Sequence, residues 1–212
     1  MQELLKRFNE LLIAKNEVIN LTAHKTIESS WQNNIIDSLL FTDYFPKACK
    51  MLDLGSGCGC PAIPLKISLP ELNVTLIDSV NKKIEFLNET VRSLSLQNIS
   101  AIHTRIEDYA QKHREAFDIV TARAVAELPT LLEYAIPFLK VGGKLFAYKG
   151  KNYQEEIEKS KFALKELGAE VIANVSQQPS DDITRHLIII GKTRPTPVKY
   201  PRGKNLPRLK PL

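Results

Sequence analysis

Hydrophobic residues first recur at the three- and four-residue spacing of an amphipathic helix. Near the N-terminus this spacing predicts one helix, with its apolar positions at Leu4, Leu5, Phe8, Leu11 and Leu12. Thr26 is suited to cap a second helix, whose apolar face would carry Trp31, Ile35, Ile36, Leu39 and Leu40. Two or three helices are therefore expected before the first strand.

From residue 51 onward, short apolar runs alternate with segments of helical periodicity. The runs predict strands at 51–54, 74–78, 99–104, 117–122, 143–149, 170–175 and 186–190. Helices are predicted between them, at 80–94, at 107–112, from Pro129 onward and at 153–167. This alternation favours an α/β fold with a doubly wound, mostly parallel sheet and right-handed crossovers. A short Gln/Pro/Ser/Asp loop separates the last two strands, which allows them to pair antiparallel at one edge.

A chain of 212 residues with 43% hydrophobic content is long enough for one domain with a substantial core. We divide it into a helical extension at 1–48, a core domain at 49–193 and a tail at 194–212. No apolar run approaches the roughly 18 residues of a membrane span, and the N-terminus begins an amphipathic pattern rather than a signal peptide. We expect a cytoplasmic protein that has no membrane contact.

The cysteine and histidine content indicates neither a disulfide framework nor a metal site. The three cysteines, Cys49, Cys58 and Cys60, are odd in number, and four histidines are scattered through the chain. We interpret all three cysteines as reduced thiols.

The excess of basic residues belongs to the tail. Of 29 basic side chains, six lie at 194–212, where there is no acid, so the rest of the chain is nearly neutral. Five prolines exclude a long helix there and predict a segment that is extended or disordered when it is alone. Such a segment either follows a phosphate backbone or serves only as a solvated tail. For the first alternative the RNA-binding candidates are Arg202, Lys204, Arg208 and Lys210.

A glycine-rich turn follows the first strand. Asp53 ends the strand, and Gly55, Gly57 and Gly59 alternate through the turn; glycine at such positions permits positive φ and close backbone approach. A dinucleotide fingerprint would need glycine where Cys60 stands, so NAD is disfavoured. The pattern D-x-G-x-G-x-G instead resembles the first motif of S-adenosylmethionine-dependent methyltransferases. Asp78 ends the next strand, where it is suited to accept hydrogen bonds from a ribose diol.

Other strand ends carry further candidates. Arg123 ends a buried strand, where a charge needs an anionic or polar partner: a ligand or a salt bridge to Asp53. Lys149 ends the next strand, and it either faces the same region or extends to solvent. Ile106 and Glu107 would contact an adenine ring, or the acid would simply lie in the first turn of a helix.

With these residues in place, the chain resembles the RsmG family, also called glucose-inhibited division protein B. The resemblance runs nearly from end to end. It rests on Asn20-Leu21-Thr22-Ala23, Asp37-Ser38-Leu39, Asp53-Leu54-Gly55-Ser56-Gly57, Pro61, Ile63-Pro64-Leu65, Leu76-Ile77-Asp78-Ser79, Arg123-Ala124-Val125-Ala126, Lys149-Gly150, Arg185-His186-Leu187, Tyr200-Pro201-Arg202 and Lys210-Pro211-Leu212. Two departures are Cys58-Gly59-Cys60-Pro61-Ala62, where the family usually has A-G-F-P-G, and Asn34, where it usually has histidine.

The resemblance implies a seven-stranded, Rossmann-like class I methyltransferase fold with an N-terminal helical extension. It also implies methyl transfer from S-adenosylmethionine to N7 of one guanosine in 16S ribosomal RNA, with the small subunit as partner and no metal; we expect a monomer. The implied cofactor contacts are Gly55, Cys60, Ile106, Glu107 and Arg123, in addition to Asp53, Gly57, Gly59 and Asp78.

The implied chemistry agrees with the absence of a Cys/His or Ser/His constellation. N7 of guanine carries a lone pair and no proton, so its methylation needs orientation rather than a general base. We assign the catalytic candidates Arg123 and Lys149 to donation toward guanine O6, which leaves N7 free. The alternatives are a non-catalytic RNA-binding protein that retains the fold and a methyltransferase acting on a small molecule or a protein. A nucleotide-dependent oxidoreductase is disfavoured by the glycine spacing.

Overall fold

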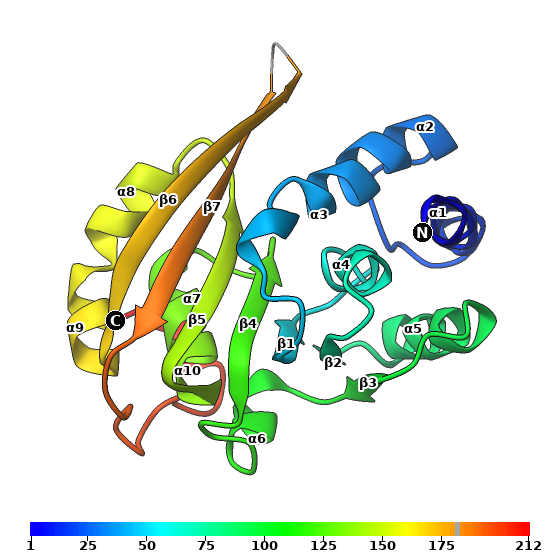
Figure 1. The fold of residues 1–212 in the computed structure, drawn as a ribbon. Coiled ribbons are helices and arrows are strands. Elements are labelled where there is room, and N and C mark those ends of the chain that lie inside the picture. The colour runs from blue at the N-terminus through cyan, green and yellow to red at the C-terminus, as the bar shows by residue number, and fades with distance from the viewer. Residues whose placement is uncertain (181–182) are drawn as a thin grey trace.

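The computed structural model describes residues 1–180 and 183–212, and a seven-stranded sheet forms its centre (Figure 1). The strands are β1 (Lys50–Leu54), β2 (Asn73–Asp78), β3 (Ile99–His103), β4 (Phe117–Arg123), β5 (Leu139–Lys149), β6 (Ala169–Ser180) and β7 (Ile183–Lys192). Their order is β3-β2-β1-β4-β5-β7-β6. The predicted doubly wound α/β sheet is confirmed.

The first five strands pair in parallel, and β7 enters antiparallel between β5 and β6. The order reverses between β1 and β4, and in such sheets ligands bind beyond the carboxyl ends of the strands at this reversal. The last two strands do pair antiparallel, but they are longer than predicted and take up most of the expected loop. Residues 181–182 of that loop lie outside the described residues.

Helices cover both faces of the sheet (Figure 1). On one face lie α4 (Ala62–Ser68), α5 (Asn81–Ser93), the π-helix η1 (Trp31–Ile36), α3 (Asp37–Leu39) and the 3₁₀-helix η2 (Thr42–Tyr44). Outside them, α1 (Gln2–Asn16) packs against α4, α5 and η1, and α2 (Ile27–Ser30) packs against α1 and η1. The other face packs against α6 (Ile106–Ala110), α7 (Leu128–Ala135), the 3₁₀-helix η3 (Ile136–Phe138), α8 (Tyr153–Lys159), α9 (Lys161–Leu167) and α10 (Leu206–Leu209). The N-terminal helices are therefore part of the packing of the first face.

Two predicted helices are interrupted. Thr26 does cap the second helix, by accepting from Ser29 N, but that helix widens into a π-helix over Trp31–Ile36. The helix predicted at 153–167 breaks at Ser160, whose hydroxyl donates to the Glu156 carbonyl at 2.7 Å. A serine that bonds the preceding turn in this way competes with regular helical geometry.

The tail at 194–212 packs on the core and includes the short helix α10. No long helix forms, and outside α10 the docked segment has neither regular helix nor strand; an extended or disordered state of the isolated tail stays a prediction. Arg114 donates to the carbonyls of Thr196 and Tyr200, and Arg202 donates to both oxygens of the buried Glu133. These contacts give hydrogen-bond partners to charged side chains and backbone carbonyls whose pairing cannot be read from the sequence.

Candidate functional site

The glycine turn bends the chain tightly over the end of β2. Gly55, Gly57 and Gly59 have φ of +60°, +53° and +89°, the left-handed region that favours glycine. Gly57 N donates to Asp78 Oδ2 at 2.9 Å, and Val80 N donates to Asp78 Oδ1 at 2.9 Å. These bonds fix the carboxylate, whose oxygens retain further acceptor sites.

A cleft of about 430 Å³, which we call the smaller cleft, opens beside this carboxylate. It contains the predicted residues Gly55, Asp78, Ile106 and Glu107. The remaining lining residues are Ser79, Val80, Lys83, Thr104, Arg105, Ala124, Val125, Tyr134, Asn205 and Arg208. Two carboxylates, which accept hydrogen bonds, and one apolar side chain converge there, a set that suits the hydroxyl groups, amine and flat ring of a nucleoside.

A larger cleft of about 620 Å³ lies over the ends of β4 and β5. It contains the predicted Arg123 and Lys149. Its polar wall comes on one side from the N-terminal segment, with Thr22, His24, Asn33, Asn34 and Asp37. On the other side it comes from β5 and β7, with Tyr148, Arg185 and His186, and from Glu156 of α8. The two clefts share Ala124 and Val125, so the β4–α7 turn separates them.

Arg123 is held by the π-helix. Its two terminal nitrogens donate to the Asn33 carbonyl and to Asn34 Oδ1, each at 3.1 Å. The sequence left open whether Arg123 contacts a ligand or forms a salt bridge with Asp53. In the structure its guanidinium has polar partners in the cleft and no bond to Asp53. Two hydrogen bonds leave three of the five guanidinium N–H groups for a ligand.

Lys149 lies in the same cleft with a largely buried side chain. Its Nζ donates to the Ala126 carbonyl at 2.8 Å and pairs with Glu156 Oε2 at 2.5 Å. Glu156 Oε2 also accepts from Leu128 N at the start of α7. Lys149 therefore supports the β4–α7 turn and retains one of its three N–H donors.

Asp53 lies beneath the glycine turn, 1% exposed, and lines neither cleft. Burial raises the pKa of its carboxyl to about 7, against the lowering effect of a 2.7 Å hydrogen bond from Thr121 Oγ1 to Oδ1. Oδ2 is buried without a hydrogen-bond partner in the described part of the chain. A buried acceptor in this state favours a cationic or hydrogen-bond-donating neighbour.

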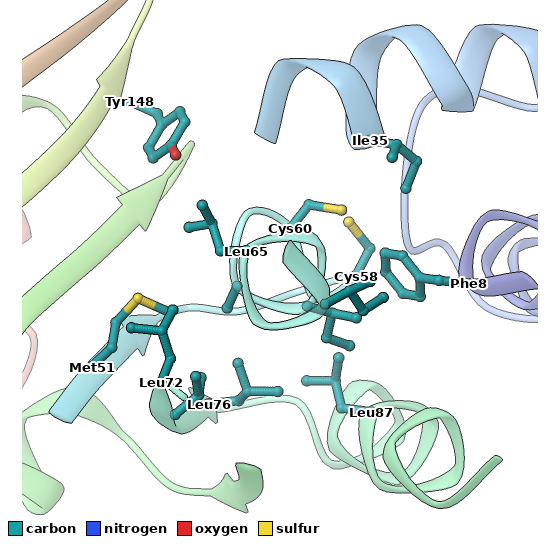
Figure 2. Packing of buried hydrophobic residues seen from close by; sticks show 14 of the residues in the cluster. Phe8, Ile35, Met51, Cys58, Cys60, Leu65, Leu72, Leu76, Leu87 and Tyr148 are labelled. Carbon is teal, nitrogen blue, oxygen red and sulfur yellow. The ribbon is translucent and has the colours of Figure 1, made fainter. Parts of the chain in front are cut away.

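Of the remaining predicted cofactor residues, Gly59 and Cys60 are buried in the core, whereas Gly57 is half-buried in the turn. The sulfur atoms of Cys58 and Cys60 point toward each other between α4 and the N-terminal helices (Figure 2), and burial raises the pKa of the Cys60 thiol. A Cβ at Gly59 would lie 2.6 Å from Ile63 Cδ1 and 2.9 Å from Leu87 Cδ2. Packing against α4 and α5 therefore accounts for this glycine. All three cysteines are free thiols.

Two of the predicted RNA-binding residues contact the protein: Arg202 is bound to Glu133, and Arg208 NH2 donates to the Val125 carbonyl at 3.1 Å. Lys204, Arg208 and Lys210 are exposed. The structure thus brings Arg208 to the smaller cleft.

Sequence reasoning did not select Asp37 and Arg185, although both lie in the motifs that carried the resemblance. Arg185 Nε donates to Asp37 Oδ2 at 2.6 Å, which joins β7 to α3 across the larger cleft. Tyr134 and Asn205 were also missed, because only the docked tail brings them together. No local sequence signal connects residues so far apart.

Within residues 1–180 and 183–212, no three His, Cys, Asp or Glu side chains gather closely enough to hold a metal ion. None of the helices there combines the length and the apolar character needed to cross a bilayer.

The chain is similar in sequence to known proteins. Residues 1–188 match the family model described as rRNA small subunit methyltransferase G. Proteins named ribosomal RNA small subunit methyltransferase G are similar over nearly all of both chains. That of Alkaliphilus metalliredigens is 41% identical, covering 100% of this chain and 90% of its own, and that of Lachnoclostridium phytofermentans is 44% identical, covering 97% and 87%.

Solved structures share the fold at low identity. M. jannaschii TYW2, solved in complex with AdoMet, superposes with a TM-score of 0.62 at 20% identity, covering 76% of this chain and 75% of its own. The T. thermophilus 16S rRNA N2 G1207 methyltransferase (RsmC), solved with AdoMet and guanosine, gives 0.53 at 17% identity, covering 76% and 40%.

Proposed function

This chain belongs to the rRNA small subunit methyltransferase G family, and we propose that it transfers a methyl group from S-adenosylmethionine to N7 of one guanosine in 16S ribosomal RNA. The observation that carries the proposal is that two clefts meet across Ala124 and Val125, at the carboxyl ends of the strands. One suits a nucleoside, and the other has room and donors for a base.

The chain's own residues fit the cofactor. Asp78 would accept from the ribose hydroxyls, while Ile106 would pack on the adenine and Glu107 would accept from its amine. Gly55 allows the backbone to approach, since a Cβ there would already lie 3.1 Å from Val125 Cγ2. The unpartnered Asp53 Oδ2 favours positive charge close to the turn. S-adenosylmethionine supplies an activated methyl group on a sulfonium.

For the larger cleft we propose that Arg123 or Lys149 donates to guanine O6. Each retains N–H groups beyond its protein contacts, and donation to O6 alone leaves N7 accessible. No proton has to be removed from N7, so these residues orient the base rather than act as a general base.

The decisive test uses purified protein, S-adenosylmethionine with a labelled methyl group, and small subunits from cells that lack this chain. Mass spectrometry of the rRNA should locate one 7-methylguanosine in 16S RNA, and the same mark should be absent from the starting cells. Arg123→Ala and Lys149→Ala should each methylate more slowly while still folded. A label on another atom, on protein or on small metabolites would contradict the proposal.

For the RNA we propose phosphate contacts at Lys204 and Lys210, whose side chains are exposed. Arg202 and Arg208 remain candidates for RNA contacts, but only with the N–H groups that do not bind the protein itself. Replacing Lys204 and Lys210 together by Gln should weaken rRNA binding and reduce the salt dependence by about two counterions. The matched control replaces the exposed Lys47 and Lys50, which lie just before β1 and at its first residue, at the amino end of this inner strand. Equal affinities for the two double variants would refute this assignment.

A further inference from the structure

The C-terminal segment forms one wall of the smaller cleft. Asn205 and Arg208 line it together with Asp78, Ile106 and Glu107, although about one hundred residues separate the two sets in sequence. In Figure 1, α10 and the red end of the chain lie near α7. The cleft is therefore complete only when this segment is docked.

Three contacts with α7 fix the segment. Thr130 Oγ1 donates to the carbonyl of the buried Pro207 at 3.0 Å. Tyr134 OH lies 3.5 Å from Asn205 Oδ1, and Arg202 pairs with Glu133. Because all three partners belong to one helix, the segment has a defined position relative to the start of α7.

From this position Arg208 reaches the turn that separates the two clefts. Its NH2 donates to the Val125 carbonyl at 3.1 Å. Ala124, directly before, has φ of +57°, a left-handed conformation that L-residues rarely adopt and that persists only where the surroundings hold it. Val125 packs over Gly55, and both turn residues line both clefts.

We propose that Arg208 is a positioning residue for the cofactor: it holds the Ala124–Val125 turn in the shape that closes the smaller cleft around the nucleoside. The C-terminal segment is then part of the cofactor site and not only an RNA contact. This inference rests on the proposed placement of S-adenosylmethionine in the smaller cleft.

The test is calorimetric titration of the full chain with S-adenosylhomocysteine. Arg208→Gln should raise the dissociation constant by about tenfold, the usual scale for losing a hydrogen bond from a charged group. Arg208→Lys should restore part of the affinity. The control is Lys199→Gln, which removes the same charge from the same segment, because Lys199 pairs with Glu166 and does not line the cleft. In turnover assays Arg208→Gln should raise KM for S-adenosylmethionine by a larger factor than it lowers kcat at saturating cofactor.

An unchanged dissociation constant for Arg208→Gln, in a protein that melts like the parent, would overturn the inference. Weakened rRNA binding with unchanged cofactor binding would overturn it equally, because Arg208 would then be an RNA contact. A folded Asp78→Asn variant distinguishes an error in the cofactor placement from an error in the role of Arg208. If that variant binds normally, the cofactor placement itself is wrong; if it loses binding while Arg208→Gln does not, only the role of Arg208 fails.

Discussion

Arg202 forms a bidentate ion pair with Glu133, whose side chain is completely buried on α7. The guanidinium donates to Oε2 at 2.6 Å and to Oε1 at 2.9 Å, and the backbone N of Arg202 donates to Oε1 at 2.7 Å. A buried carboxylate is stable only when its charge is compensated. The tail is therefore needed for the stability of α7, beyond its effect on the cleft.

Arg202→Ala should lower the free energy of unfolding by about 3–5 kcal/mol, because it leaves Glu133 buried and uncompensated. Urea denaturation monitored by circular dichroism measures this change. The double variant Arg202→Met with Glu133→Leu removes both charges at similar volume and should recover most of the loss. If the single variant lost less than about 1 kcal/mol, the pair would contribute no more than a surface ion pair.

The raised pKa of Asp53, to about 7, predicts a specific pH dependence. Between about pH 4 and 7 the folded protein binds a proton at Asp53 that the unfolded chain has released, so this residue makes stability fall as pH rises. Asp53→Asn cannot titrate. Relative to the parent it should gain stability across this window, by about 4 kcal/mol at most.

Thermal and urea unfolding at intervals from pH 4 to 8 measure the difference. Asp118→Asn is the matched control, because the hydrogen bond from Lys140 lowers the pKa of Asp118 and places its titration below this window. The difference between Asp118→Asn and the parent should stay constant from pH 4 to 7. A flat difference for Asp53→Asn as well would show that its carboxyl titrates outside this range.

The order of strands and helices was predictable because each element carries its own signal. Apolar runs ending in Asp53 and Asp78 identified two neighbouring strand ends, and the structure places both acids by the glycine turn. The break at Ser160 and the π-helix at Trp31–Ile36 were not predictable, since each depends on one hydrogen bond or on packing rather than on periodicity.

The docking of the tail could not be predicted from the sequence. Prolines and basic residues without acids describe a disordered segment when they are considered locally. Its docking depends on Glu133 and Thr130, which lie about seventy residues earlier. Likewise, Gly59 belongs to a motif associated with cofactors, yet the neighbours of its missing Cβ are Ile63 and Leu87. Sequence identified the motif but not which glycines contact a ligand.

The glycines of the turn differ in the atoms that an added methyl group would contact. Replacing them by alanine should therefore lower the free energy of unfolding by different amounts. Gly59→Ala combines φ of +89° with contacts below 3 Å to Ile63 and Leu87, so it should cost about 2–4 kcal/mol in unfolding free energy. Gly57→Ala has a similar backbone cost, but its nearest neighbour is Gly55 O at 3.7 Å, and it should cost about 1–2 kcal/mol. Equal losses would mean that α4 and α5 move aside.

Asn34 connects the helical side of the larger cleft to Arg123 through three side-chain hydrogen bonds. Removing these bonds should change both the stability and the methylation rate. Its Nδ2 donates to Thr22 Oγ1 and Ser30 Oγ at 3.1 Å each, while Oδ1 accepts from Arg123. Asn34→Leu has similar volume and loses all three bonds, so it should lower the free energy of unfolding by about 2–3 kcal/mol. It should also slow methylation, because Arg123 would retain only the Asn33 carbonyl.

Asn34→Asp is the matched control for that substitution, since its carboxylate can accept from Arg123 and from the two hydroxyls after they rotate. It should therefore stay closer to the parent than Asn34→Leu in both urea denaturation and single-turnover methylation. The comparison separates orientation of Arg123 from general packing: if Asn34→Leu methylated as fast as Asn34→Asp, the contact from the π-helix would not orient the arginine. If both were as stable as the parent, the three hydrogen bonds would be replaceable by water.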